Sequence, residues 1–188
     1  MKFRLPAAAA LSLLAAVAVM GVAQGQRPAV TVQLLALNDF HGNLEAPSGG
    51  NGLIGRTPAG GVEYLATHLK NEFARNPNSI VVAAGDLIGA SPLLSALFHD
   101  EPAIEALNAL KLSVTSVGNH EFDHGSDELL RMQKGGCHPV DGCQDGDGFT
   151  GAAFEYLSAN VLRVQDSAPL FPATAVRTVG GVKIGLRV

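Results

Sequence analysis

The sequence predicts an α/β domain built around a parallel sheet. Short runs of β-branched and aliphatic residues alternate along the chain with segments of helical period, as in domains where each strand is followed by a crossover helix. Three of the apolar runs are each followed by a short polar cluster, which is typical of α/β sheets that gather a site at their strand ends. There is no internal repeat with the roughly 20–50-residue period of a solenoid.

The first half of the chain contains two predicted strands and one helix. Residues 31–37 form an apolar run that predicts a buried strand. Residues 47–52 contain too many glycines for a regular element. Apolar residues recur at helical spacing in 61–73, which predicts an amphipathic helix. The run 79–84 predicts the second strand.

The second half continues the alternation. Residues 92–110 indicate a helix with a break near Pro102, and 113–117 indicate the third strand. A short helix is predicted over 127–133 and another strand over 155–161.

The last predicted element is a hairpin within residues 175–186, where two strand-like runs flank Gly180-Gly181. The chain ends at Val188 within a strand-like run. A strand with no successor leaves an open sheet edge, which natural domains usually cover. We therefore expect a domain that is truncated before completion.

The first 25 residues indicate an export signal. Lys2 and Arg4 precede an almost wholly apolar run, which ends in small residues suited to signal peptidase. A transmembrane anchor is the alternative, since roughly 18 apolar residues is the lower limit of a span. The alanine-rich composition favours cleavage. We expect residues 1–25 to be a signal peptide, 26–188 to form the domain, and the product to be periplasmic or secreted without stable membrane insertion.

The charge distribution argues against nucleic acid as a partner. The formal net charge is −4, and the 13 lysines and arginines are scattered without a basic run that could bind a phosphate backbone. Nothing in the sequence indicates an oligomeric state.

Cys137 and Cys143 are the two cysteines and lie in a loop rich in glycine. An even count in an exported chain favours a disulfide. A metal pair is the alternative, but it needs two more soft ligands nearby, and His138 is the only such residue between the cysteines.

Three polar clusters follow three of the predicted strands, at residues 38–42, 85–86 and 118–123. Asp39 and His41 are two positions apart, and on an extended chain such residues point the same way, so both can face one ion. The carboxylate of Asp86 can place one oxygen on each of two cations, and Asn119 supplies a neutral oxygen ligand. Together these ligands suit manganese, iron or zinc. Because strand ends converge in parallel sheets, we expect one shared metal site.

The order of Asp-x-His, Gly-Asp and Gly-Asn-His-Glu resembles that of the calcineurin-like metallophosphoesterases. The longer segments 37–43, 84–86, 117–125 and 155–161 resemble the exported bacterial 5′-nucleotidases, and the likeness extends over about residues 30–186. The resemblance implies a metallophosphoesterase-type α/β/β/α sandwich, of which this chain holds the amino-terminal part.

The resemblance also implies a metal-dependent hydrolase of phosphoric esters that acts on nucleotides. Asp39 and His41 would bind the first of two divalent ions (manganese, zinc or iron), Asp86 would bridge both, and Asn119 would bind the second. A metal-bound hydroxide would attack phosphorus. His120 would face the phosphoryl group as a catalytic residue.

Asp123 matches the partner of that histidine in the family. Three residues apart, His120 and Asp123 can meet if the segment forms a helical turn, so that the carboxylate orients the ring and favours its charged form.

Several family features have no counterpart in these 188 residues. The remaining metal ligands and the carboxy-terminal nucleotide-binding domain are absent, so we expect the chain alone to be inactive. The histidines that match no ligand position are His68, His99, His124 and His138, of which His124 could approach the site. The open alternatives are a 2′,3′-cyclic phosphodiesterase, a sugar-nucleotide hydrolase, a thiosulfate-pathway hydrolase and a non-enzymatic metal-binding fragment.

Overall fold

The computed structural model describes residues 29–144 and 146–188, of which Thr31–Val188 form one compact unit. The predicted signal peptide and its cleavage point lie outside the described residues. Within the described residues, no helix combines the length and the apolar character that a membrane span requires.

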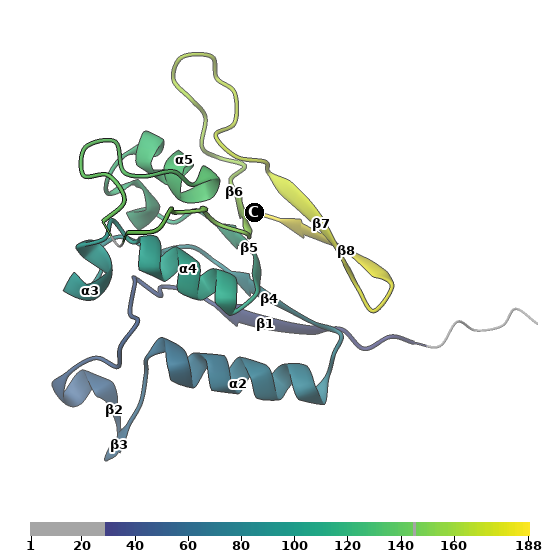
Figure 1. Cartoon of the computed structure of the whole chain (residues 1–188). Coiled ribbons are helices and arrows are strands. Elements are labelled where there is room, and N and C mark those ends of the chain that lie inside the picture. Colours follow the sequence, from purple (N-terminus) through teal and green to yellow (C-terminus); the bar gives the residue numbers. More distant parts are fainter. Residues whose placement is uncertain (1–28, 145) are drawn as a thin grey trace, which may run out of the picture. The chain divides into compact units, whose positions relative to one another are not determined.

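The centre of the unit is a parallel sheet of four strands (Figure 1). In spatial order these are β1 (Gln33–Leu37), β4 (Ser79–Ala83), β5 (Leu112–Ser116) and β6 (Glu155–Leu157). Every neighbouring pair is parallel, which confirms the predicted α/β class. As a consequence, the loops that follow all four strands leave from the same edge of the sheet.

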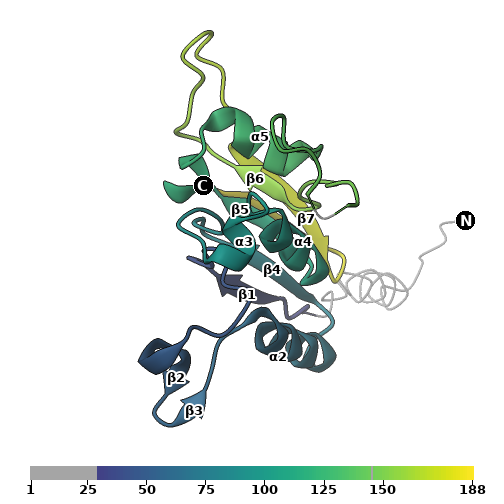
Figure 2. The same cartoon turned by 60° about the vertical axis from the view of Figure 1, so that its left-hand side comes forward.

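The connecting helices cover one face of this sheet (Figure 2). They are α2 (Val62–Arg75), α3 (Leu93–Ala96), α4 (Glu101–Ala109) and α5 (Ser126–Lys134). Their apolar faces meet the strands in one core, in which Ile104, Leu129 and Tyr156 are fully buried. Burying a large apolar side chain contributes about 1.5–3 kcal/mol, so this face holds the helices in place.

The helical region 92–110 is broken near Pro102, as predicted, although Pro102 is not itself the break. The break falls between α3 and α4, where His99 and Asp100 adopt left-handed backbone with φ of 53° and 62°. Pro102 lies just inside α4, within its first turn. A proline there removes an N–H group that would have no helical partner, so it starts this helix instead of breaking one.

The antiparallel hairpin of β7 (Thr174–Val179) and β8 (Val182–Arg187) confirms the predicted Gly180-Gly181 turn. Both glycines have positive φ, as a two-residue hairpin turn requires. The hairpin packs on the sheet through a small cluster of Val114, Leu157, Ala175 and Leu186. On β6, Leu157 faces this cluster while its neighbour Tyr156 faces the helical core, so the hairpin is a second β layer opposite the helices.

Some local structure differs from the predictions. The glycine-rich segment contains a 3-10 turn, η1 (Gly49–Gly52), followed by the short antiparallel pair β2 (Leu53–Ile54) and β3 (Thr57–Pro58). The strand predicted over 155–161 stops at Leu157.

The predicted disulfide between Cys137 and Cys143 is confirmed.

Candidate metal centre

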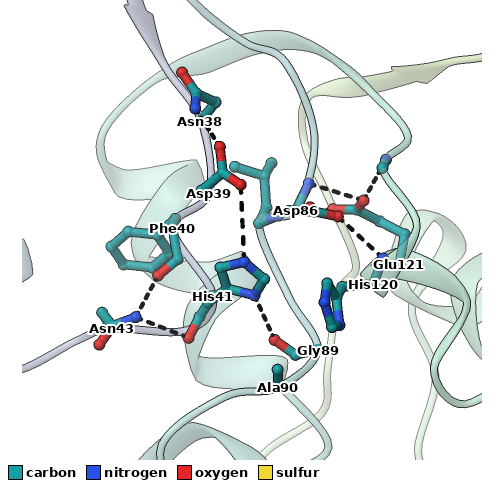
Figure 3. Close-up of polar contacts among 12 residues, drawn as sticks. Asn38, Asp39, Phe40, His41, Asn43, Asp86, Gly89, Ala90, His120 and Glu121 are labelled. Atoms are coloured by element: carbon teal, nitrogen blue, oxygen red, sulfur yellow. Dashed lines mark hydrogen bonds and ion pairs between the residues drawn. The ribbon is translucent and has the colours of Figure 1, made fainter.

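The candidate site lies where the loops after β1, β4 and β5 meet (Figure 3). The first two loops continue the pairing of their strands, because Asp39 N–H donates to the Gly85 carbonyl (3.1 Å) and His41 N–H donates to the Asp86 carbonyl (3.0 Å). Gly85 also touches the third loop: a Cβ added there would lie 2.6 Å from the backbone nitrogen of Gly118. Glycine is therefore required for this close approach.

Asp39, His41 and Asp86 all adopt left-handed backbone, with φ of 51°, 44° and 50°. The extended geometry predicted for Asp39 and His41 is therefore wrong. Left-handed backbone costs a residue with a Cβ roughly 1–2 kcal/mol, and such strain is concentrated at functional sites. Here the hydrogen bonds between the loops hold the strained residues in place.

The left-handed turns bring three ligand groups together. Donor atoms of Asp39, His41 and Asp86 lie within 4.8 Å of one another, and the His41 Nε2 to Asp39 Oδ1 distance is 3.9 Å. His41 Nδ1 lies 2.8 Å from the Gly89 carbonyl, which can only accept, so Nδ1 carries the proton. The lone pair of Nε2 is therefore free for a metal ion, the usual way in which a second hydrogen bond orients a histidine ligand.

Asn119 lies at the start of η2 (His120–Phe122), the 3-10 turn that follows β5. Its side chain is exposed. The backbone N–H of the next residue, His120, donates to Asp86 Oδ1 at 3.0 Å, so the carboxylate of Asp86 adjoins the turn that carries Asn119.

The turn also brings His120 and Asp123 together, with His120 Nδ1 at 2.8 Å from Asp123 Oδ2. The His120 ring meets the His41 ring edge-on, with 4.9 Å between ring centroids. The hydrogen bond with Asp123 raises the pKa of His120 above its ordinary value, and the charges of Asp123 and Asp86 act in the same direction. The same bond lowers the pKa of Asp123.

Glu121 is a buried residue to which the sequence assigned no role. Its carboxylate accepts backbone N–H groups of Asp86 (3.0 Å), Leu87 (2.7 Å) and Gly118 (2.5 Å), so it joins the second and third loops. Burial raises the pKa of Glu121, while the three N–H donors oppose that shift. The sequence offers one hint of this role, which is that Glu121 lies between the candidate site residues His120 and Asp123. The hint is insufficient, because the burial of Glu121 depends on the tertiary fold.

Two further carboxylates bind the loop after β4. Buried Asp100 accepts the Gly89 N–H at 3.1 Å and the Ser95 hydroxyl at 2.7 Å. Asp123 accepts the Ala90 N–H at 3.1 Å. With Glu121, three carboxylates from two segments, the η2 turn and the turn before α4, therefore fix the backbone around Asp86.

The remaining histidines divide into two groups. His68 on α2 and His124 after η2 are exposed, and neither belongs to a group of three close metal-binding side chains within the described residues. The rings of His99 and His138 are stacked on each other and belong to a separate group of side chains with Glu128.

Curated proteins similar to this chain include enzymes of nucleotide metabolism. The chain is 48% identical over 169 residues to an uncharacterized protein in the pqq-V 5′ region of Acinetobacter calcoaceticus, and the match covers 84% of this chain and 83% of that protein. It is 38% identical to endonuclease YhcR of Bacillus subtilis, over 82% of this chain and 13% of the relative. It is 30% identical to a 2′,3′-cyclic-nucleotide 2′-phosphodiesterase/3′-nucleotidase of Yersinia enterocolitica, over 86% of this chain and 23% of the relative. The chain thus spans less than a quarter of the last two proteins.

No family model matches the chain. Solved structures of nucleotidases, however, are similar to it. NAD nucleotidase (NadN) of Haemophilus influenzae is similar with a TM-score of 0.64 and 26% identity, over 84% of this chain and 26% of that one. The 5′-nucleotidase precursor of Thermus thermophilus is similar with a TM-score of 0.64 and 28% identity, over 84% of this chain and 28% of that one.

Proposed function

The chain belongs to the calcineurin-like phosphoesterases of the 5′-nucleotidase type, and we propose that it carries the metal-binding part of a hydrolase that cleaves phosphate esters of nucleotides. The observation that carries this proposal is the convergence of Asp39, His41 and Asp86 beside His120 at the strand ends. The names of the similar proteins support nucleotides as the substrate class.

The ligand set fits divalent ions. Asp39 and His41 would hold one ion, Asp86 would contribute to both, and Asn119 would hold the second. Oxygen and imidazole donors of this kind suit manganese, zinc or iron. When bound, such ions activate water as a nucleophile and stabilise charge on the attacking and leaving oxygens.

His120 is the group of this chain that would act on the phosphoryl group. Its Nδ1 is held by Asp123, and the raised pKa favours the charged ring. An imidazolium in this position stabilises negative charge and can protonate the leaving oxygen through Nε2. Asp123 orients the ring and is itself held by the Ala90 N–H group.

Cyclic nucleotides are a second candidate substrate. The 30% identity to the Yersinia enzyme, over 86% of this chain, favours a 2′,3′-cyclic phosphodiester as the alternative. Both reactions would use the same ligands, so substrate choice depends on residues outside this site.

Export to the periplasm or the medium is part of the proposal. The apolar amino-terminal segment supports it, and so does the disulfide, because disulfides persist in oxidising compartments.

A chimera tests the proposed function. The chain would be continued with the remainder of the Thermus 5′-nucleotidase, and phosphate release from a nucleoside 5′-monophosphate and from a 2′,3′-cyclic nucleotide would be measured with manganese. We expect metal-dependent turnover that Asp86→Ala abolishes. His120→Ala should lower kcat while leaving manganese affinity nearly unchanged. A folded chimera without metal-dependent hydrolysis of either substrate would contradict the proposal.

A further inference from the structure

A second group of metal-binding side chains shares no residue with the site at the strand ends. Donor atoms of His99, Glu128 and His138 lie within 4.8 Å of one another, and all three side chains are half-buried. His99 comes from the turn between α3 and α4, Glu128 from α5, and His138 from the disulfide-closed loop. The fold therefore gathers these groups from three separate segments.

Asp141 provides a fourth donor at suitable distances. Its Oδ2 lies 2.9 Å from His99 Nε2 and 3.3 Å from His138 Nδ1. A tetrahedral zinc ion with bonds of about 2.0–2.1 Å holds its donor atoms about 3.3 Å apart. One ion could thus contact all three groups without a large backbone movement, by replacing the proton that His99 Nε2 donates to Asp141.

The loop that carries His138 and Asp141 is already constrained. The disulfide joins Cys137 to Cys143 with 4.7 Å between their Cα atoms, and His138 pairs with Gly142 in an antiparallel bridge. The Asp141 N–H donates to His138 Nδ1 at 3.2 Å, so this nitrogen is unprotonated, and an ion bound there would take over the lone pair that now accepts this N–H.

The charge of the cluster favours a divalent cation. Glu128 binds Arg131 through both oxygens (2.7 and 2.9 Å), and Arg131 also pairs with Glu101. With Asp141 there are three carboxylates and one guanidinium, so the cluster carries a formal charge of −2 when both imidazoles are neutral. A divalent ion would balance this charge.

The two imidazole rings are stacked, with centroids 3.7 Å apart and an angle of 8° between their planes. The lone pairs of the ring nitrogens lie in the ring planes, so in parallel rings they do not converge on one point. An ion shared by both nitrogens therefore requires the rings of His99 and His138 to tilt toward each other, a side-chain adjustment that leaves the loop in place.

We propose that His99, His138 and Asp141, with Glu128 as a fourth donor, bind one divalent transition-metal ion. Imidazole with carboxylate selects zinc, nickel or copper over magnesium and calcium, and four donors suit zinc. Bound there, the ion ties the disulfide loop to α5 and to the turn before α4. Its role is structural, and it is independent of phosphate-ester hydrolysis.

Zinc titration of the full chain tests this site. Asp86→Asn serves as the background, because it weakens the strand-end site. We expect this variant to bind one zinc ion. Adding His138→Gln or Asp141→Asn should raise the dissociation constant at least about tenfold, the effect seen even for outer partners of metal sites. Adding His68→Gln, which changes an exposed histidine of α2, should have no effect. Zinc should also raise Tm in the background variant but not in the His138→Gln variant.

A second measurement does not depend on the folding of variants. Zinc should protect His99 and His138 of the unchanged chain from diethyl pyrocarbonate, and His68 should react equally with and without zinc. Unchanged zinc affinity in the His138→Gln and Asp141→Asn variants, or equal modification of His99 and His138 with and without zinc, would overturn the proposal. Neither outcome would bear on the chimera assay, which depends on Asp86 and His120.

Discussion

At the scale of single residues, the carboxylate of Glu121 connects two loops of the site. It is 3% exposed and accepts three backbone N–H groups, two from the loop after β4 and one from the loop after β5. An ionised carboxylate can accept all three, whereas an amide in its place has one oxygen and would direct its NH₂ group at a donor.

We therefore predict that Glu121→Gln lowers the free energy of unfolding by about 1–3 kcal/mol, the range for leaving a buried donor without its partner. Urea unfolding monitored by circular dichroism measures this. Glu63→Gln, at an exposed position of α2, is the matched control and should change little. Equal stability of the two variants would show that Glu121 does not hold the loops together.

The ion pair of His120 and Asp123 should make the stability of the fold depend on pH. The pKa of His120 is raised, so its contribution to stability is complete below the ordinary histidine value of 6.5 and is lost as the pH rises through the raised value. The pKa of Asp123 is lowered, so its contribution is complete above the ordinary value of 3.8 and is lost as the pH falls through the lowered value. The pair therefore stabilises the fold most between those two ordinary values.

Asp123→Asn should lower the pKa of His120 toward the ordinary value, because the amide removes both the charge and the preferred acceptor. An NMR titration of the imidazole signals in metal-free protein measures this. The signals of His68, which is exposed on α2, serve as an internal reference and should not differ between the two proteins. An unchanged His120 titration would mean that Asp123 does not set the charge of the ring.

At the scale of elements, apolar patterning was sufficient to predict the strands of the parallel sheet and most helices, because it reports which face each element buries. It did not predict the left-handed backbone of Asp39, His41 and Asp86. That geometry comes from hydrogen bonds between loops distant in sequence, such as His41 N–H to the Asp86 carbonyl. The three candidate ligands could be named from their residue types and come together in the structure, but the way in which the backbone presents them could not be predicted.

The position of the break between α3 and α4 also depends on a hydrogen bond between segments that are separate in the sequence. Pro102 was the visible local signal, yet it lies within the first turn of α4. The chain turns earlier, at His99 and Asp100, where the Asp100 carboxylate accepts the Gly89 N–H. Local propensity could not reveal that partner.

The disulfide should contribute only modestly to the free energy of unfolding. Cys137 and Cys143 are six positions apart, and closing so short a loop contributes only about 2–3 kcal/mol in the chain-entropy model. Replacing both cysteines with serine should lower the free energy of unfolding by no more than this and leave the far-UV spectrum unchanged. A variant that fails to fold would show that the loop governs the fold.

At the scale of the whole molecule, we propose that the number of metal ligands limits the activity of the 188-residue chain. Asp39, His41 and Asp86 would form a set for one ion, whereas the second ion would have only Asp86 and Asn119 from this chain. Phosphoryl transfer of this kind relies on both ions for positioning and charge stabilisation. Loss of one ion should cost several kcal/mol of barrier, and each 1.36 kcal/mol is about tenfold in rate.

We predict that the 188-residue chain alone hydrolyses p-nitrophenyl phosphate at least about 100-fold more slowly than the chimera, since two factors of ten correspond to only about 2.7 kcal/mol. Both proteins would be assayed with the same manganese concentration. Robust turnover by the short chain, lost in Asp86→Ala, would show that the chain supplies a complete site; the family assignment would be unaffected.

The carboxylates around the loop after β4 also suggest an order in which a complex would assemble. The N–H groups of four loop residues, Asp86, Leu87, Gly89 and Ala90, are all bound by side-chain carboxylates. Loops that cradle phosphate in other enzymes use such N–H groups as their anion contacts. Here these N–H groups are already occupied, and the carboxylates around them repel an anion. We therefore expect a phosphate ester to bind more tightly after cations have offset these charges than before, so metal loading should precede substrate binding.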